Sequence, residues 1–490
     1  MDETTADILT PDLVKKRTVV GIVALTSRNF VLQGIAFAAT FFFTILLSKE
    51  QYGVVYLMFA VQGFMNYFAD IGLAAALVQK KGDVTKKDLS TTFIVQHTLI
   101  IILLLVLVFN VSKIQQFFNL SGESQALLYA FAFAFFLSSL KTIPSVLLER
   151  KIQFEKLIIP QIAEVLIYNI VGVFLVWKGF GLLSFVYAII LSRVIGLILI
   201  YIIQPWFPTL QFSPQSFKEL IRFGLPYQAN TFIALIKDEG LTLGLAKILG
   251  AGPLGLFAWS KKWAEAPLRF FMDQVIKVTF PAYSRMQNDP KALSNALTRS
   301  IFFICLLVFP SLIGLVTVAP LLIRIIPRYG QWEPALIPMA IYAINILFAA
   351  FVTPITNFFN AIGEIKITSA FMVFWTALSW LLVPFLATKY GINGAAAGYA
   401  LVGLSSVGVL VIASSFVKID YLYAIIKPLF SAAVMGGVVY WLSLNVPVNA
   451  FGVILLILSG FITYLASIYL LVGPTVVTDL KTALANLKKR

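Results

Sequence analysis

The sequence is poor in the residues that many enzymes and metalloproteins depend on. Its 490 residues include one cysteine, Cys305, and one histidine, His97. A single cysteine excludes a disulfide framework or a thiolate metal cluster within the chain, and a single histidine argues against a histidine-based metal site or catalytic triad. The G-x-x-x-x-G-K-[ST] loop that cradles nucleotide phosphates is also missing. We therefore expect no metal site, no cofactor and no ATP hydrolysis by this chain.

Charged residues are scarce as well. They make up 12% of the chain, against 60% hydrophobic residues, and the mean hydropathy is +0.91. A soluble domain is about 25% charged and about 45–50% apolar. This apolar surplus cannot be buried in a water-soluble fold, and apolar stretches of about 20 residues, the length that spans a bilayer, recur along the chain. The composition predicts an all-α integral membrane protein.

Apolar stretches between charged, proline or glycine breaks predict about fourteen spans. The expected ranges are 21–47, 53–78, 92–110, 125–148, 157–177, 181–203, 220–247, 253–281, 297–325, 335–361, 367–388, 393–416, 424–443 and 451–472. The loops on the outer side are short, and no segment outside the membrane is long enough for a catalytic domain. We therefore predict that the protein is not an enzyme.

The loop charges give the orientation. With fourteen alternating spans, 22 lysines and arginines fall on one side of the membrane and 7 on the other. Because basic residues gather in cytoplasmic loops, the richer side is the cytoplasmic one and both termini lie there. The net charge of +15 is therefore a topology signal rather than a sign of nucleic-acid binding. We expect a multi-pass protein of a bacterial or archaeal cytoplasmic membrane.

The chain also repeats itself. Gly179 and the Tyr187-Ala188 pair recur 212 residues later as Gly391 and Tyr399-Ala400, each at the start of a span. Such repeats are typical of transporters that use two related bundles. The predicted domains are a cytoplasmic tail (1–20), an N-terminal six-helix bundle (21–203), a cytoplasmic linker (204–219), a C-terminal six-helix bundle (220–416), two additional helices (417–472) and a basic tail (473–490).

Charges within the expected spans are the candidate functional residues. The densest set lies on the span 253–281, where Lys261, Glu265, Arg269, Asp273 and Lys277 stand four residues apart with alternating sign. With Lys262 added, all six charges fall on one side of a helix. Each charge in hydrocarbon costs about 2.5–3.5 kcal/mol, so this side must face protein or a watery cavity. Pro267, in the middle of the span, allows a kink.

Two interpretations of this row stay open. Opposite charges four residues apart can neutralise one another as structural salt bridges. Alternatively, the positive excess can attract an anionic headgroup, because arginine and lysine are the usual partners of phosphate. On the second interpretation, the substrate-binding candidates are Arg28, Arg193, Lys261, Lys262, Arg269 and Lys277. The candidates for ion coupling or gating are Asp70, Glu164, Asp238, Glu239, Glu265 and Asp273.

Several segments resemble the bacterial polysaccharide exporters, the Wzx-like O-antigen and colanic-acid flippases of the multidrug/oligosaccharidyl-lipid/polysaccharide (MOP) superfamily. They are Tyr52-Gly53, Phe68-Ala69-Asp70-Ile71-Gly72-Leu73, Ala76-Leu77-Val78-Gln79, Leu89-Ser90-Thr91-Thr92-Phe93, Leu147-Leu148-Glu149-Arg150-Lys151-Ile152-Gln153-Phe154, Gly255-Leu256-Phe257 and Phe280-Pro281-Ala282-Tyr283-Ser284. The resemblance runs from about residue 20 to about residue 420.

The resemblance implies two six-helix bundles around a central cationic cavity, with alternating access to the two sides of the membrane. Its substrate would be an undecaprenyl-diphosphate-linked oligosaccharide, carried from the cytoplasmic to the outer leaflet for cell-surface polysaccharide biosynthesis. Proton coupling, sodium coupling and the membrane potential all stay open as energy sources. We expect a monomer embedded in membrane lipid, which could associate with the polysaccharide polymerase machinery. The alternative is a multidrug or cation antiporter of the same superfamily.

Overall fold

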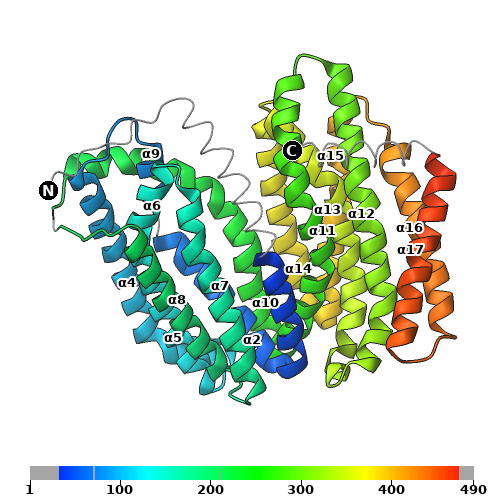
Figure 1. Cartoon of the computed structure of the whole chain (residues 1–490), viewed down its shortest axis with the longest axis horizontal. Helices are drawn as coiled ribbons and strands as arrows, with labels where there is room; N and C mark the ends of the chain where they lie inside the picture. Colours follow the sequence, from blue (N-terminus) through cyan, green and yellow to red (C-terminus); the bar gives the residue numbers. More distant parts are fainter. Residues whose placement is uncertain (1–31, 70–71, 210, 474–490) are drawn as a thin grey trace. The chain divides into compact units, whose positions relative to one another are not determined.

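The computed structural model describes residues 32–69, 72–209 and 211–473, and within these ranges all secondary-structure elements are helices, joined by loops (Figure 1). Each expected span coincides with helical segments, although residues 21–31 of the first span and 70–71 of the second lie outside the described part. In the described ranges, nine helices are long and apolar enough to cross a membrane, or ten if the bent pair Lys49–Phe68 and Leu73–Gln79 is one span. One of the nine, Ile365–Ser414, holds two expected spans because Gly391 breaks its helical backbone.

The contacts divide the chain into two compact units, Met1–Gly252 and Pro253–Arg490. The first unit contains the helix Leu32–Leu46, α2 (Lys49–Ala69), α3 (Leu73–Gln79), α4 (Lys86–Phe118), α5 (Glu123–Leu140), α6 (Thr142–Arg150), α7 (Phe154–Trp177), α8 (Leu183–Ile203), α9 (Pro214–Leu235), the π-helix η1 (Ile236–Gly240) and α10 (Leu241–Leu249). Within this unit α8 packs against both α5 and α7. The sequence analysis assigned 220–252 to the second bundle; in the structure α9 packs on α3 and α4, and α10 packs on α2.

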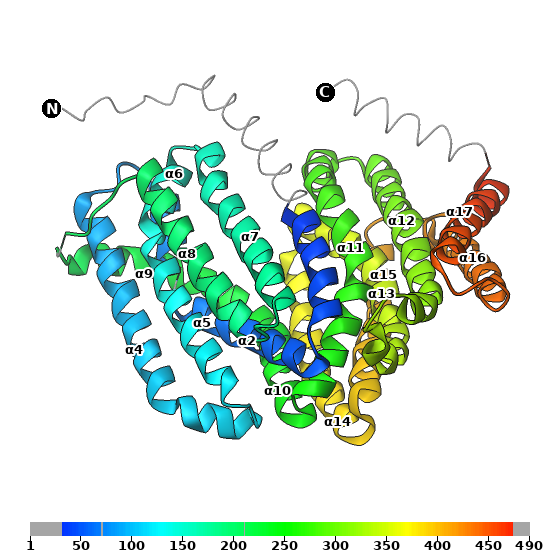
Figure 2. The ribbon, with the colours of Figure 1, turned by 60° about the horizontal axis from the view of Figure 1, so that its bottom comes forward.

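The second unit begins just inside α11 (Ala251–Met286). It continues with α12 (Pro290–Ile325), the 3₁₀ helix η2 (Tyr329–Ala335), α13 (Leu336–Ala361), α14 (Ile365–Ser405), α15 (Val407–Ser414), the π-helix η3 (Leu422–Ile426), α16 (Lys427–Ser443) and α17 (Ala450–Val472). Helix α12 packs against α13 on one side and against α16 on another, and α17 lies beside α16 (Figures 1 and 2). The two additional helices of the sequence analysis are thus attached to the unit through α12.

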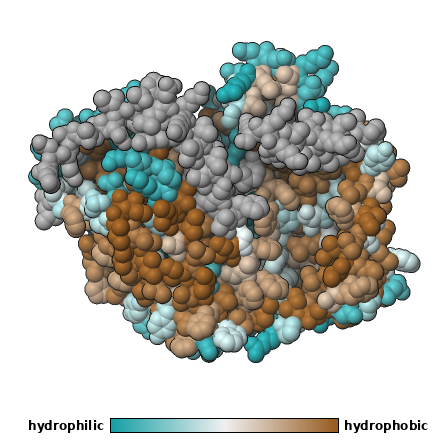
Figure 3. All heavy atoms as spheres, in the orientation of Figure 1, coloured by the Kyte–Doolittle hydropathy of each residue, from teal (hydrophilic) through white to brown (hydrophobic). Residues whose placement is uncertain are grey.

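Large apolar side chains lie exposed on the outside of the helices. Along α17 these are Phe451, Ile454, Ile457, Leu458, Phe461 and Ile462, and α4 exposes a similar row from Ile101 to Phe109. Figure 3 shows such residues as brown atoms over the part of the molecule where Figure 1 places α17. In water this surface would be costly, whereas lipid accepts it. These faces are the ones expected against the acyl chains.

The repeated glycines have a matching backbone. Gly179, between α7 and α8, has φ 89°, and Gly391, which breaks α14, has φ 60°. A residue with a side chain rarely adopts such values, whereas glycine does so readily. The repeat therefore marks two helix junctions at which the glycine has a positive φ.

A charged network outside the apolar part of the first unit joins four helices. Arg150, at the end of α6, donates hydrogen bonds to the carbonyls of Leu77 and Lys80, at 2.6 and 2.9 Å, and so satisfies carbonyls at the end of α3. The Lys80 ammonium lies 3.1 Å from Asp88 of α4 and 3.0 Å from Glu219 of α9. This network fixes the ends of α3, α4, α6 and α9 together.

Candidate functional site

The first unit holds a buried carboxylate between two cations. The Glu164 side chain on α7 is 10% exposed. One carboxylate oxygen accepts from the Lys141 ammonium, which lies between α5 and α6, and the other lies 2.5 Å from the Arg193 guanidinium on α8. Three helical segments thus supply one residue each. We call Lys141, Glu164 and Arg193 the Glu164 cluster.

A glycine makes room for this cluster. Gly196 lies on α8, three residues after Arg193, and a Cβ atom placed on it would overlap the Glu164 carboxylate. The absence of a side chain there lets α7 and α8 approach closely with the charges between them. The sequence predicted Glu164 and Arg193 as separate candidates for gating and phosphate contact, and the structure brings them together as an ion pair.

The second unit holds a different arrangement on α11. Glu265 accepts hydrogen bonds from the Arg269 guanidinium at 2.8 and 3.1 Å, and the Lys261 ammonium lies 3.9 Å from its other oxygen. These three residues are consecutive members of the i,i+4 row that the sequence predicted. Tyr342 of α13 donates its hydroxyl to Glu265 at 2.7 Å. We call Lys261, Glu265, Arg269 and Tyr342 the Glu265 cluster.

Aromatic rings surround the Lys261 end of this cluster. The Lys261 ammonium lies 5.6 Å from the ring centroid of Tyr399 on α14, within the range of a cation–π contact. The Tyr399 ring stacks on Phe257 with a centroid distance of 5.8 Å, and Tyr342 lies edge-on to both rings. Lys261 and Glu265 are therefore held in place by packing, with 15% of each side chain exposed.

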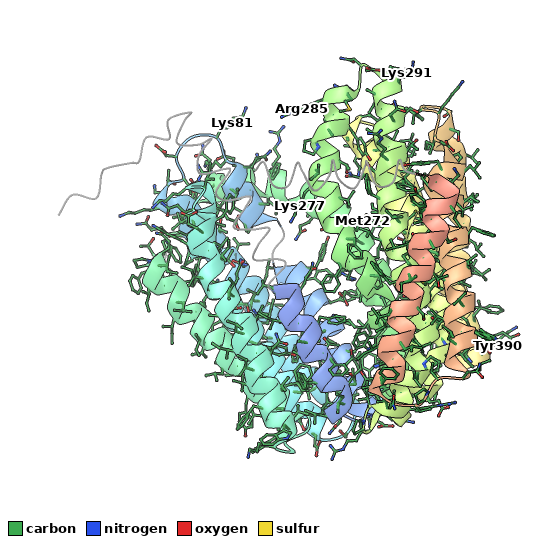
Figure 4. The ribbon with its side chains drawn as sticks, turned by 45° about the vertical axis from the view of Figure 1, so that its right-hand side comes forward. Lys81, Met272, Lys277, Arg285, Lys291 and Tyr390 are labelled. Atoms are coloured by element: carbon green, nitrogen blue, oxygen red, sulfur yellow. The ribbon has the colours of Figure 1, made fainter. Side chains whose placement is uncertain are left out.

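Other cations of α11 are exposed. The Arg269 side chain is 71% exposed although it bonds to Glu265. Lys262 and Lys277 are exposed too, and neither forms an ion pair with a residue whose side chain the structure describes. Lys277 lies on α11 between Met272 and Arg285 (Figure 4). The helix continues through Pro267, from Ala251 to Met286.

The adjacent acids Asp238 and Glu239 lie in η1, a π-helical segment between α9 and α10. The Asp238 side chain is 60% exposed and lies 3.8 Å from the Lys237 ammonium. Glu239 instead packs beside Gly63 of α2, where a Cβ atom would come within 2.9 Å of its Cγ. The two carboxylates thus have different surroundings. π-Helical segments are frequent at functional sites, so η1 stays a candidate for coupling.

Three predicted site residues lie outside the described structure. Arg28 and Asp70 fall in undescribed residues, and the side chain of Asp273 is not described. Within the described ranges, no group of three or more His, Cys, Asp or Glu is placed to hold a metal ion.

Sequence reasoning missed two members of these clusters. Neither Lys141 nor Tyr342 was among the candidate site residues of the sequence analysis. Tyr342 is 77 residues from Glu265 and 3% exposed. The sequence does contain one signal for Tyr342, which is a tyrosine on an otherwise apolar span. A buried tyrosine hydroxyl usually needs a hydrogen-bond partner.

Comparisons with known proteins place the chain in a family. The family described as "Polysaccharide biosynthesis protein" matches residues 43–336, more than half of the chain. The succinoglycan biosynthesis transport protein ExoT of Rhizobium meliloti (strain 1021) is 23% identical over 71% of this chain and 68% of that protein. The lipopolysaccharide biosynthesis protein WzxC of Escherichia coli (strain K12) is 27% identical over 40% of this chain and 39% of that protein, less than half of either.

Two solved structures share the fold. The lipid II flippase MurJ in an inward closed conformation superposes with a TM-score of 0.72 at 18% identity, covering 92% of this chain and 98% of MurJ. An inward-facing multidrug resistance MATE transporter of the MOP superfamily gives a TM-score of 0.61 at 16% identity, covering 81% and 98%. The resemblance seen in the sequence is thus confirmed, and the named neighbours are transporters rather than enzymes. The chain belongs to the polysaccharide biosynthesis protein family, and it has the multi-pass helical fold of these membrane transporters.

Proposed function

We propose that the protein is a flippase that moves an undecaprenyl-diphosphate-linked oligosaccharide from the cytoplasmic to the outer leaflet by alternating access. Basic residues of α11 contact the diphosphate. The substrate class is supported by the names of the relatives, which concern succinoglycan transport, lipopolysaccharide biosynthesis and lipid II. In this proposal the protein lies in the bacterial cytoplasmic membrane with both termini inside.

The observation that carries the proposal is the exposed positive charge on α11. Lys262, Arg269 and Lys277 are exposed on α11, the helix that precedes the apolar span α12. Each charge in a membrane span costs about 2.5–3.5 kcal/mol unless it meets water, protein or an opposite charge. The cations of the row that are not packed against protein are therefore candidates to meet an anionic substrate. A diphosphate has the charge and the oxygen geometry to bind several of them at once.

The two members of the row that are packed against protein have a different proposed role. Lys261 and Tyr342 hold Glu265, and Glu265 in turn orients Arg269 through two hydrogen bonds. The Arg269 side chain is 71% exposed, so substrate can reach it. In the first unit, Arg193 already forms an ion pair with Glu164. This pairing weakens the expectation that Arg193 contacts phosphate. Arg28 stays a predicted phosphate contact, and Asp238 with Glu239 stay predicted coupling residues.

The test is translocation in proteoliposomes loaded with undecaprenyl-diphosphate oligosaccharide, followed with a glycosidase added outside. We expect Lys262→Ala and Arg269→Ala each to slow loss of the protected inner pool by about tenfold or more, since a charge-assisted hydrogen bond contributes about 1.5–3 kcal/mol. Arg285→Ala, at the end of the same helix, is the matched control and should translocate normally. An imposed potential shows whether the cationic site responds to voltage.

Normal translocation by both variants would remove the phosphate-contact assignment. Failure of the unmodified protein to accelerate translocation of several glycan types would remove the substrate class. In that case cation-driven dye efflux tests the antiporter alternative.

A further inference from the structure

A cavity of about 420 Å³ opens at the end of α12 remote from its connection to α11. It is bordered by the last turns of α12, by η2 and by the first residue of α13, and it is open on one side. The lining includes Pro320, Ile323, Arg324, Arg328, Glu333 and Leu336. None of these residues belongs to the Glu265 cluster or to the exposed cations of α11. The cavity is therefore separate from the candidate site on α11.

Two arginines give this cavity its charge. Arg324 and Arg328 both line it and are both exposed. Neither forms an ion pair or a side-chain hydrogen bond with the rest of the described chain. Glu333 supplies the only carboxylate among the lining residues, so the lining carries net positive charge. Guanidinium groups bind phosphate oxygens in a forked geometry, and two of them at one cavity favour a phosphate group.

Buried aromatic residues fix the segment that presents Arg328. Trp332 is fully buried and stacks on Trp259 of α11 with a centroid distance of 5.7 Å, while Tyr329 lies edge-on to the same ring at 6.2 Å. Ser260, next to Trp259, donates its hydroxyl to the Ala335 carbonyl at 2.7 Å. Both ends of η2 are thus anchored. A rigid segment loses little freedom when a ligand binds, which favours affinity.

The backbone at Arg328 is unusual for a residue with a side chain. Its φ of 65° lies in the left-handed region, where glycine is the usual occupant. An arginine is present at a position where glycine would fit with less strain. Strain kept in this way is frequent at ligand-binding sites.

The position along the span indicates what kind of phosphate binds. The cavity comes where the apolar run of α12 ends, and Ile323, Ile326 and Leu336 give one part of its lining an apolar character. Arginines at the end of a span lie at the level of the lipid headgroups. We propose that this cavity binds the phosphate of a lipid headgroup, with Arg324 and Arg328 on the phosphate oxygens and the apolar lining against the start of the lipid chain.

Two lipids carry this chemistry, namely a bilayer phospholipid and a polyprenyl phosphate. The experiment measures binding to the purified full-length protein by native mass spectrometry, with phosphatidylglycerol, phosphatidylcholine, undecaprenyl phosphate and inorganic phosphate as separate probes. Tighter binding of phosphatidylglycerol assigns the site to bilayer lipid, and tighter binding of undecaprenyl phosphate assigns it to the polyprenyl lipid. Inorganic phosphate that binds as tightly as either lipid would overturn the lipid part of the proposal.

Two variants test the arginines. Arg324→Ala should weaken binding of the preferred anionic lipid by about tenfold, the effect of one charge-assisted contact, and leave phosphatidylcholine unchanged. Arg328→Gly should weaken it similarly while relieving the backbone, so its thermal stability should not fall. Arg285→Ala removes an exposed arginine at the other end of the unit (Figure 4) and is the matched control.

Glu333→Gln provides a test of opposite sign. Removal of the only carboxylate of the lining should tighten binding of the anionic lipid. Unchanged binding in Arg324→Ala and Arg328→Gly, or an equal loss in Arg285→Ala, would overturn the site. None of these variants alters the α11 cations, so the result is independent of the translocation test.

Discussion

Each compact unit contains a carboxylate held by one lysine and one arginine, but the two are built differently. In the Glu164 cluster the three charges come from three helical segments, and Gly196 lets them meet. Breaking the cluster would leave two cations between packed helices. The cluster links three packed helical segments, and each of its members is buried or half-buried.

In the Glu265 cluster the charges come from one helix. Lys261, Glu265 and Arg269 follow one another at intervals of four, so their pairing needs no partner helix. The neighbouring helix α13 contributes only a neutral hydroxyl, from Tyr342. Arg269 stays mostly exposed while it is paired.

The comparison separates two uses of charge in a membrane. In the Glu164 cluster the carboxylate pairs with cations from other helical segments. The pairs link these segments, and the opposite charges neutralise one another. In the Glu265 cluster the carboxylate shares one helix with its cations, and the paired Arg269 side chain is still 71% exposed. Each cluster holds one carboxylate, one lysine and one arginine, so geometry rather than charge count distinguishes them.

The largest effect is expected from Glu164→Leu. It leaves the half-buried Lys141 and Arg193 without their counter-charge, and loss of one partner from a buried ion pair costs about 3–5 kcal/mol. We expect a steep fall in the yield of monodisperse protein and in its thermal unfolding midpoint in detergent. The triple variant Lys141→Met/Glu164→Leu/Arg193→Met removes all three charges and should regain most of the stability. A stable Glu164→Leu protein would contradict the structural role.

The second effect is expected from Gly196→Ala. The added methyl group overlaps the Glu164 carboxylate, and overpacking of this kind costs about 1–3 kcal/mol. Gly437→Ala on α16 is the matched control, because a Cβ atom there meets nothing within 4 Å. Thermal unfolding of the two variants should differ clearly. Equal midpoints would mean that the Glu164 cluster has room to shift.

The third effect is expected from Tyr342→Phe in the Glu265 cluster. Tyr342→Phe removes the hydroxyl that donates to Glu265, and a hydrogen bond to a charged group contributes about 1.5–3 kcal/mol. We expect the lower end of this range, because Arg269 and Lys261 still neutralise the carboxylate. Translocation should fall more than stability, since Glu265 orients the exposed arginine. A fall in stability with normal translocation would make the Glu265 cluster a structural tie like the Glu164 cluster.

Much of the fold could be predicted from the sequence because the bilayer sets the length of each span. The expected ranges 157–177 and 297–325 nearly coincide with α7 and α12. The packing of the helices could not be predicted in the same way. Hydropathy indicates that 220–247 crosses the membrane, but only contacts with α2, α3 and α4 show that it belongs to the first unit.

The same distinction applies to the candidate site. The pairing of Lys261, Glu265 and Arg269 was predictable, because residues four apart in a helix are neighbours whatever the fold. The meeting of Lys141, Glu164 and Arg193 was not, because it depends on which helices pack together and on the space left by Gly196. The contact of Tyr342 with Glu265 could not be predicted for the same reason, because it joins α13 to α11. Local pattern thus predicted the cluster on one helix and missed the cluster between helices.

The smallest effect is expected outside the apolar spans, where water competes with the ion pair between Lys80 and Glu219. The Glu219 side chain is 56% exposed, and exposed pairs contribute about 0.2–1 kcal/mol. Glu219→Gln should therefore lower stability by no more than this, since Asp88 still pairs with Lys80 at 3.1 Å. Thermal unfolding midpoints of Glu219→Gln and Glu164→Leu, measured in parallel, compare the exposed Lys80–Glu219 pair with the Glu164 cluster.

The pH dependence of this pair follows from Lys80. Burial lowers the pKa of Lys80, but hydrogen bonds and charges from Glu219 and Asp88 outweigh burial, so its pKa lies above the ordinary lysine value. A raised pKa means that the contribution to stability is complete below the ordinary value and is lost only as the pH rises through the raised one. The difference between Glu219→Gln and the unmodified protein should therefore be constant around neutral pH and shrink in strong alkali. A difference that changes near neutral pH would mean that another group, not Lys80, controls this network.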